Sequence, residues 1–242
     1  NGLITSKKNG CKTIGFLGSN GGKIKDIVDV AVTVNSKSTP RIQEVHRTIF
    51  HIICDLAEQD LTNWRDMNTR ILKNKNCLVT GATGGIGKHI VKLLLKNQCN
   101  VFLTSKNNTN LKNFCKSLAL KNSKISYFAA DLANTSKIDL LIKKVKSSFS
   151  SIDILINCAG VFQIKPIEKC DNKEFDELLN VNLKAPFLLS KAFSKEMKKK
   201  KWGRIVNIGS SSSYSGFKNG TLYSSSKHGI LGLSRSLSSE LK

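Results

Sequence analysis

Two side chains near the end of the sequence, Tyr223 and Lys227, have the types and the spacing of a proton-exchange pair. The surrounding pattern predicts a helix over 223–241, and residues four apart on a helix lie on one face. A phenol ordinarily ionises near pH ~10, so a neighbouring ammonium favours the phenolate and brings proton exchange toward neutral pH. The pair therefore predicts general acid–base chemistry.

A second candidate site is the glycine-rich stretch that follows Cys77-Leu78-Val79-Thr80. It reads Gly81-Ala82-Thr83-Gly84-Gly85-Ile86-Gly87 and precedes a predicted helix. Glycines let the backbone approach a pyrophosphate closely, and a helix N-terminus offers free N–H groups and a positive dipole end. An ordinary glycine-rich turn is the alternative. Its place in a strand–turn–helix unit favours a dinucleotide site.

The hydrophobic pattern from residue 72 onward predicts the scaffold that positions these residues. The expected strands are Asn76–Thr80, Val101–Thr104, Ile125–Phe128, Ile152–Asn157 and Arg204–Ile208. The expected helices lie near Gly87–Lys96, Leu111–Leu120, Ser136–Ser147, Asn172–Lys200 and Tyr223–Leu241. Apolar strands that alternate with helices predict an α/β fold with a Rossmann-type, doubly wound parallel sheet, which binds ligands at the carboxyl ends of its strands.

The spacing Thr-Gly-x-x-x-Gly-x-Gly, which begins at Thr80, resembles the short-chain dehydrogenase/reductase family. The resemblance covers about Leu72 to Lys242, and its further motifs are Asp131-Leu132, Asn157-Cys158-Ala159-Gly160, Asn182-Leu183 and Tyr223-x-x-x-Lys227. The motifs are most similar to those of 3-oxoacyl carrier-protein reductases. The resemblance implies an NAD(P)-dependent oxidoreductase that reduces a carbonyl or oxidises an alcohol. A 3-oxoacyl thioester is the first expected substrate, and a sugar or sugar nucleotide is the second.

The resemblance also implies a catalytic set of four residues: Asn182, Ser210, Tyr223 and Lys227. In this set Tyr223 protonates the substrate oxygen, while Ser210 polarises it. Asn182 orders a water that links Lys227 to solvent. Four serines occupy 210–213, and only the spacing to Tyr223 selects Ser210.

The resemblance further implies the cofactor contacts. They are Gly81, Thr83, Gly84, Gly85, Ile86, Gly87, Lys106, Asp131, Leu132, Asn157, Ala159, Gly160, Tyr223 and Lys227. An acidic residue at the end of the second strand binds the ribose of NAD, but this chain has Thr104-Ser105-Lys106 there. We therefore expect NADP, with NAD as the alternative and a solvated surface role as the alternative for Lys106. Cys158 replaces the family's second Asn and is expected to be a small buried residue.

Residues 1–61 resemble a different family, the sugar-isomerase (SIS) domain of sedoheptulose-7-phosphate isomerases. Three stretches carry this resemblance: Lys12-Thr13-Ile14-Gly15, Gly21-Gly22-Lys23 and Arg41-Ile42-Gln43-Glu44-Val45-His46. It implies a partial SIS-type α/β segment, joined to residues 72–242 by a junction at 62–71. Gln43 and His51 match two zinc ligands of that family. Zinc is expected only if the isomerase part is complete upstream, and the alternative is that His46 and His51 are ordinary surface residues.

Composition gives the broad setting. The chain has 39 basic and 17 acidic residues and a net charge of +22. The basic residues are nearly all Lys, spread among many Asn and Ile, a composition that A/T-rich codons produce, so a nucleic-acid partner is not expected. The seven scattered cysteines and the absence of an apolar span predict free thiols, no membrane association and a cytoplasmic location.

Two alternatives to the reductase remain open at this point. One is a phosphosugar isomerase, or a bifunctional isomerase–reductase for bacterial heptose and envelope-sugar synthesis. The other is a non-catalytic basic protein that uses the Rossmann fold for binding. From the resemblance we also expect a chain cut at both ends, with the rest of the reductase absent after Lys242. We therefore expect the chain by itself to catalyse little or nothing, and the full-length protein to be a homo-oligomer, dimer or tetramer.

Overall fold

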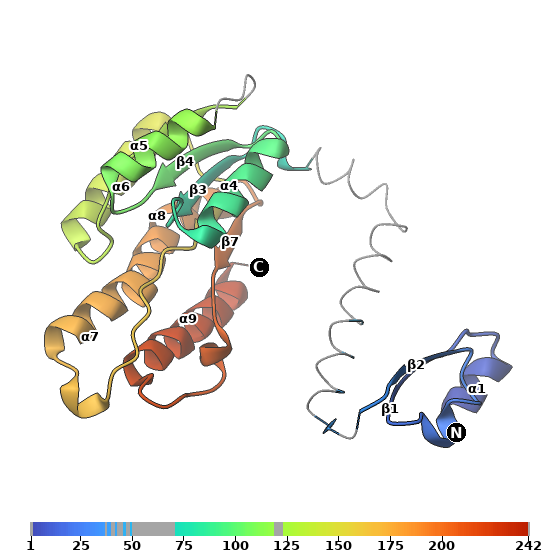
Figure 1. The fold of residues 1–242 in the computed structure, drawn as a ribbon. Helices are drawn as coiled ribbons and strands as arrows, with labels where there is room; N and C mark the ends of the chain where they lie inside the picture. Colours follow the sequence, from blue (N-terminus) through green and yellow to red (C-terminus); the bar gives the residue numbers. More distant parts are fainter. Residues whose placement is uncertain are drawn as a thin grey trace. The chain divides into compact units, whose positions relative to one another are not determined.

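The structure is a computed structural model that describes residues 2–36, 38, 39, 42, 46, 49, 71–118 and 123–241. The chain divides into two compact units, Asn1–Met67 and Asn68–Lys242 (Figure 1). The division lies inside the stretch predicted as a junction, 62–71. Each unit is described by itself below.

The first unit contains a parallel pair of strands, β1 (Ile14–Gly18) and β2 (Val30–Val34). The side chain of Asp29 joins the start of both strands, because its Oδ2 accepts hydrogen bonds from the N–H and the hydroxyl of Thr13, at 2.8 and 2.7 Å. Helix α1 (Gly2–Lys8) was not predicted from the sequence. A short 3-10 turn, Gly22–Ile24, follows β1.

Beyond β2, the described residues Thr39, Ile42, His46 and Ile49 are helical. His46 packs back onto the strand pair: its Nε2 lies 3.1 Å from the Leu17 carbonyl oxygen. The two predicted zinc ligands, Gln43 and His51, lie outside the described residues, so the zinc site stays a prediction.

The second unit is built on five parallel strands in the order β5-β4-β3-β6-β7. Their bounds are β3 Asn76–Thr80, β4 Asn100–Thr104, β5 Ile125–Tyr127, β6 Ile154–Asn157 and β7 Arg204–Asn207. The chain winds outward from β3 to β5 and then returns to the other side of β3 with β6. This reversal confirms the doubly wound Rossmann-type sheet, and its crevice lies at the carboxyl ends of β3 and β6.

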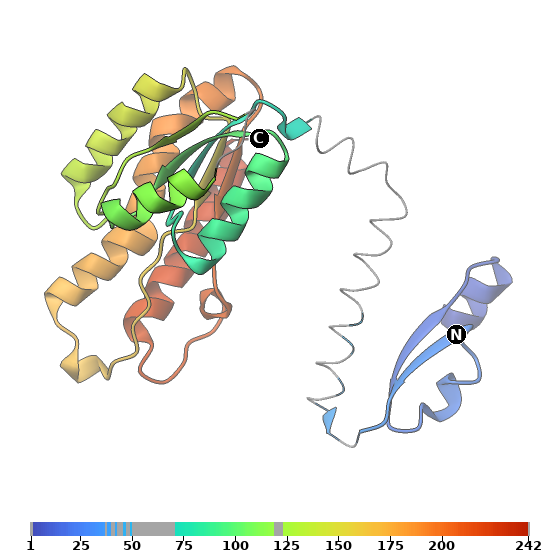
Figure 2. The ribbon, with the colours of Figure 1, turned by 45° about the horizontal axis from the view of Figure 1, so that its top comes forward.

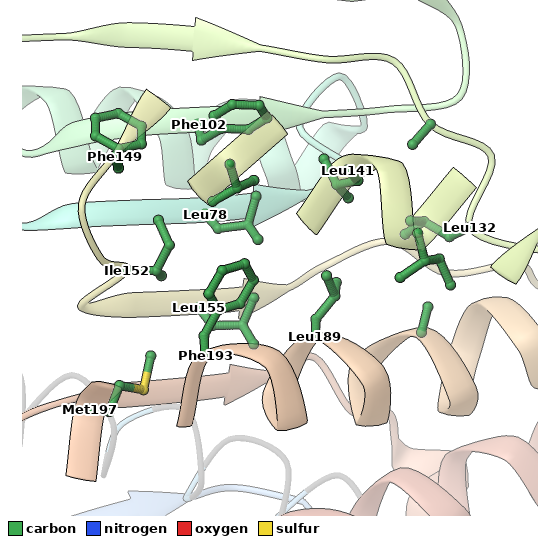
Figure 3. Close-up of a cluster of buried hydrophobic side chains, with 14 of the residues drawn as sticks. Leu78, Phe102, Leu132, Leu141, Phe149, Ile152, Leu155, Leu189, Phe193 and Met197 are labelled. Atoms are coloured by element: carbon green, nitrogen blue, oxygen red, sulfur yellow. The ribbon is translucent and has the colours of Figure 1, made fainter. Parts of the chain in front are cut away.

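Helices cover both faces of this sheet because the strand residues alternate between two cores. Leu78 and Leu155 point to one face, where they pack with α6 (Thr135–Ser148) and α8 (Ala185–Lys199) (Figure 3). Val79 points to the other face, toward α4 (Gly85–Lys96) and α5 (Asn108–Ser117). Figure 2 shows the two helix layers with the sheet between them.

The single helix predicted over Asn172–Lys200 is wrong. The structure has α7 (Asn172–Leu179), a π-helical turn at Asn180–Lys184, and then α8. Pro186 explains the break, because it has no N–H to donate to the carbonyl four residues earlier, that of Asn182. The hydrogen bonding slips by one residue there, and the N–H of Ala185 donates to the Asn180 carbonyl.

The turn between β3 and α4 brings Gly81 against the segment that follows β6. Gly81 has φ +63°, and a Cβ there would lie 2.8 Å from the backbone N and Cα of Ala159. Gly87 is equally confined, since a Cβ there would lie 2.2 Å from the Gly81 carbonyl oxygen. In contrast, a Cβ on Gly85 meets no heavy atom within 4 Å. The close approach at Gly81 joins the two strand ends that form the crevice.

We predict that Gly81→Ala lowers the free energy of unfolding by roughly 1–3 kcal/mol, because alanine is strained at positive φ and its methyl group meets backbone. Gly85→Ala is the matched control and should leave stability unchanged or slightly higher, since alanine is the better helix former. Urea unfolding of both variants measures the difference. An equal loss in both would contradict the close approach at Gly81.

Candidate active site

A cavity of about 320 Å³ opens at the carboxyl ends of β3, β4 and β6. It is lined by Gly81, Thr83, Gly84, Ser105, Lys106, Ala130, Asp131, Leu132, Cys158, Ala159, Gly160, Val161, Glu177 and Val181. The cavity thus brings together eight of the predicted cofactor contacts: Gly81, Thr83, Gly84, Lys106, Asp131, Leu132, Ala159 and Gly160. The predicted contacts Gly85, Ile86, Gly87, Asn157, Tyr223 and Lys227 are not among its lining residues.

The buried hydroxyl of Thr80 holds in place one of the segments that line this cavity. Its Oγ1 accepts hydrogen bonds from the N–H groups of Cys158 and Ala159, both at 3.0 Å. These two bonds hold the segment after β6 against Gly81, the first residue of the glycine turn. The sequence analysis did not assign Thr80 a role, because its partners lie far away in the chain.

Lys106 lies at one end of the cavity and already has a partner there. Its Nζ is 2.9 Å from Asp131 Oδ2 and 3.9 Å from Glu177 Oε1. The hydrogen bond to Asp131 raises the pKa of Lys106. Burial raises the pKa of the Asp131 carboxyl, but the hydrogen bond and charge of Lys106, together with a hydrogen bond from the Ala133 N–H, outweigh burial and hold the pKa below its usual value. Lys106 is 69% exposed, so incoming anions can reach it.

The hydroxyls of Thr83 and Ser105 lie 2.7 Å apart beside Lys106. Together with the Lys106 ammonium they give this end of the cavity two hydroxyls and a cation. Such groups suit the oxygens of a phosphate. Ser105 was noted in the sequence only as a neighbour of Lys106.

The side-chain amide of Asn182 connects three segments of the site. Its Oδ1 accepts from the N–H of Val161 at 2.8 Å, and its Nδ2 donates to the Val161 carbonyl at 2.9 Å and to the Ser226 hydroxyl at 3.0 Å. The amide is therefore fully engaged within the protein. The backbone carbonyl of Asn182 receives no N–H from the residue four positions later, because that residue is Pro186.

Helix α9 (Thr221–Glu240) carries Tyr223 and Lys227 in its first two turns. Lys227 is buried, and its Nζ donates to the Ile208 carbonyl at the end of β7 at 2.8 Å. Burial lowers the pKa of this ammonium. The same Nζ lies 5.7 Å from the centre of the Tyr223 ring.

Gly160 links this pair to the cavity. It lines the cavity, and a Cβ placed on it would lie 3.9 Å from Lys227 Nζ and 3.5 Å from Asn182 Oδ1. Lys227 and Asn182 therefore stand directly behind the cavity wall. Two of the four predicted catalytic residues, Lys227 and Asn182, thus lie beside the predicted cofactor contact Gly160.

Ser210 follows β7 and precedes a short 3-10 turn, Ser211–Ser213, that packs against α9. Its Oγ accepts from the N–H of Ser212, and its own N–H donates to the Ser213 hydroxyl, both at 3.1 Å. Ser212 and Ser213 are buried, whereas Ser210 is half-buried. The geometry thus favours Ser210 over these two as the serine that meets a ligand.

Two phenylalanines that the sequence analysis did not consider surround Tyr223. The ring of Phe162 meets the Tyr223 ring edge to face at 4.8 Å, and the Phe217 ring lies 6.4 Å from it. Both lie in loops, where the spacing of residues in the sequence does not predict which side chains come together.

Two further properties of the described residues bear on function. Within 71–118, 123–241 and the described part of the first unit, no group of three or more His, Cys, Asp or Glu side chains could hold a metal ion. In the same part of the chain, no helix is both long and apolar enough to cross a membrane.

Comparisons with known proteins agree with this geometry. The chain matches the short chain dehydrogenase family over residues 75–242. It is 37% identical over 170 residues to the 3-oxoacyl-[acyl-carrier-protein] reductase FabG of Buchnera aphidicola, covering 70% of this chain and 68% of that protein. It is 30% identical over 164 residues to the uncharacterized oxidoreductase YxjF of Bacillus subtilis, covering 68% of this chain and 64% of that protein.

Among solved structures, a metagenomic short-chain oxidoreductase in complex with NADP is 33% identical. It superposes with a TM-score of 0.67, over 70% of this chain and 76% of that one. The chain spans about two thirds of the length of the curated relatives it matches. The glycine turn, the parallel sheet and the Tyr223–Lys227 helix are thus those of a known family, and the chain belongs to the short chain dehydrogenase family.

Proposed function

We propose that this chain carries the cofactor site and the proton-transfer residues of an NADP(H)-dependent oxidoreductase acting on carbonyl or alcohol groups. The observation that carries the proposal is the position of Lys227, buried between the Tyr223 ring and Gly160 in the wall of the cavity. A basic binding protein of the same fold has no need of this arrangement.

The residues around the cavity fit a nicotinamide dinucleotide. The glycine turn supplies space for a pyrophosphate at the start of α4, since a Cβ on Gly85 meets nothing. Asp131 and Leu132 offer contacts to an adenosine, and Lys106 offers its charge to a 2′-phosphate. When bound, the cofactor supplies or accepts the hydride. The NADP complex of the similar metagenomic enzyme supports this cofactor.

The chain's own residues would handle the proton. Tyr223 gives its phenolic proton to the substrate oxygen, which Ser210 polarises through its hydroxyl. Lys227 favours the phenolate by its charge, and it lies behind the cavity wall, beside Gly160 and Asn182. The water that returns the proton would be held by the Asn182 carbonyl, because its amide is already bonded.

For the substrate we propose a 3-oxoacyl thioester, by analogy with the reductase of Buchnera aphidicola. A sugar carbonyl is the second candidate. The full protein would work in the cytoplasm as a homo-oligomer, a dimer or tetramer.

We predict that, in the full-length protein, Tyr223→Phe reduces turnover of acetoacetyl-CoA by NADPH at least about 100-fold, because general acid catalysis contributes that much and the ring is kept. Cofactor binding, followed by NADPH fluorescence, should stay within about twofold. Turnover that survives within a few-fold would remove Tyr223 from the reaction.

Replacing Lys106 should affect the binding of NADPH and of NADH differently. We expect Lys106→Ala to weaken NADPH binding by about tenfold, the loss of one charge-assisted contact, and to leave NADH binding nearly unchanged. Fluorescence titration measures both constants. If the variant binds both cofactors as tightly as the wild type, Lys106 serves only its pair with Asp131.

We also propose that residues 1–61 are part of a SIS-type isomerase unit. The parallel β1–β2 pair and the separate compact unit support an α/β module of its own.

This unit supplies only two of the predicted zinc ligands, Gln43 and His51, whereas a protein zinc site usually has four ligands. We therefore expect the whole chain to bind zinc weakly, and to bind it no better than the His51→Ala variant. Isothermal titration with zinc measures both. Tight binding that the substitution abolishes would show that the site is complete within this chain.

A further inference from the structure

An aromatic cluster made of Phe162, Phe217 and Tyr223 contains the proposed proton donor, Tyr223, and none of the three residues lines the cofactor cavity. The rings of Phe162 and Phe217 stack at 6.3 Å, and both face Tyr223. Phe162 is 60% exposed and Phe217 is 39% exposed. Both therefore offer apolar ring surface to a molecule that reaches Tyr223.

Contacts between two loops hold the cluster in place. Phe162 lies in the loop after β6, and Phe217 lies in the loop between β7 and α9. The N–H of Lys165 donates to the Asn219 carbonyl at 2.8 Å, which joins these loops. The Phe217 ring also lies on the backbone of Gly220, where a Cβ would come within 2.4 Å of it. The ring can occupy this place only because residue 220 is glycine.

The positive charge of Lys165, which lies on the same loop as Phe162, is neutralised by an ion pair. Lys165 Nζ lies 2.7 Å from both carboxylate oxygens of Glu174, in a hydrogen-bonded ion pair. This lysine is thus held by its own carboxylate partner and is poorly placed to attract an anionic substrate group. The surface next to Tyr223 is defined by rings instead.

We propose that Phe162 and Phe217 form one wall of the substrate site and that, among 3-oxoacyl thioesters, they select those whose 3-carbonyl carries a flat apolar group, aryl or unsaturated. This inference rests on the proposed function, which places the substrate oxygen at the Tyr223 hydroxyl. The group bonded to that carbonyl must then lie near the rings around Tyr223. Flat apolar groups gain edge-to-face and stacking contacts there that a hydrated polar group does not.

The test measures binding without turnover. Methyl naphthyl ketone and hydroxyacetone are titrated into the full chain with NADP⁺, and also without cofactor, and their dissociation constants are taken from NMR shifts. The variants are Phe162→Ala, Phe217→Ala and Phe162→Leu, which keeps an apolar side chain but removes the ring. Phe187→Ala is the matched control, because Phe187 on α8 is a similarly exposed phenylalanine, at 48%. Circular dichroism verifies folding.

We expect the wild type to bind the naphthyl ketone at least about tenfold more tightly than hydroxyacetone. Phe162→Ala and Phe217→Ala should each weaken binding of the naphthyl ketone by about fivefold to tenfold, as loss of one aromatic contact implies. Phe162→Leu should weaken this binding by less, and Phe187→Ala should leave it unchanged. Hydroxyacetone binding should be the same in all variants.

Equal binding of the two ketones by the wild type, or no binding of either, would overturn the proposal. So would naphthyl ketone binding that is unaffected in both Phe162 variants. Turnover with NADPH is measured separately. A full-length protein that binds the ketone through these rings but never reduces it would support the binding role of Phe162 and Phe217 and refute the proposed oxidoreductase activity.

Discussion

The buried amide of Asn182 is the interaction on which the arrangement of the site depends. It spans the loop after β6, the break between α7 and α8, and the first turns of α9, through its bonds to Val161 and Ser226. A buried polar group that loses its partner costs about 1–3 kcal/mol. Each of these three segments is therefore held to the others, and Lys227, next to Ser226, is held with them.

This amide lies where the helix changes its hydrogen bonding, at residues 180–184. Pro186 lacks the N–H of one helical donor, and the π-helical turn accommodates the loss. The same turn therefore carries the side chain that bonds Val161 and Ser226 and the Asn182 carbonyl, to which Pro186 offers no N–H. The proposed water position and the residue that ties α9 to the site lie in this one turn.

The sequence predicted the parts of the structure that depend on local pattern. The five strands follow from apolar segments that alternate with helical ones. The glycine turn follows from its place between a strand and a helix, and the pairing of Tyr223 with Lys227 follows from helical periodicity. The π-helical turn was missed because a proline after an otherwise regular apolar pattern can also start a helix or kink one. Thr80, Phe162 and Phe217 were missed because their partners lie far away in the chain. Lys106 was predicted as a cofactor contact, but its ion pair with Asp131 was not predicted, because it depends on two strand ends that only the folded sheet brings together.

We propose that the full-length protein moves hydride at the carboxyl edge of this sheet. The most direct test is single turnover of that protein with NADPH deuterated at the transferable position and acetoacetyl-CoA as the probe substrate. We expect deuterium to appear on the new carbinol carbon, one per cofactor oxidised, and the rate to be slower than with unlabelled NADPH. Cofactor that binds in the cavity without any transfer of deuterium would contradict it.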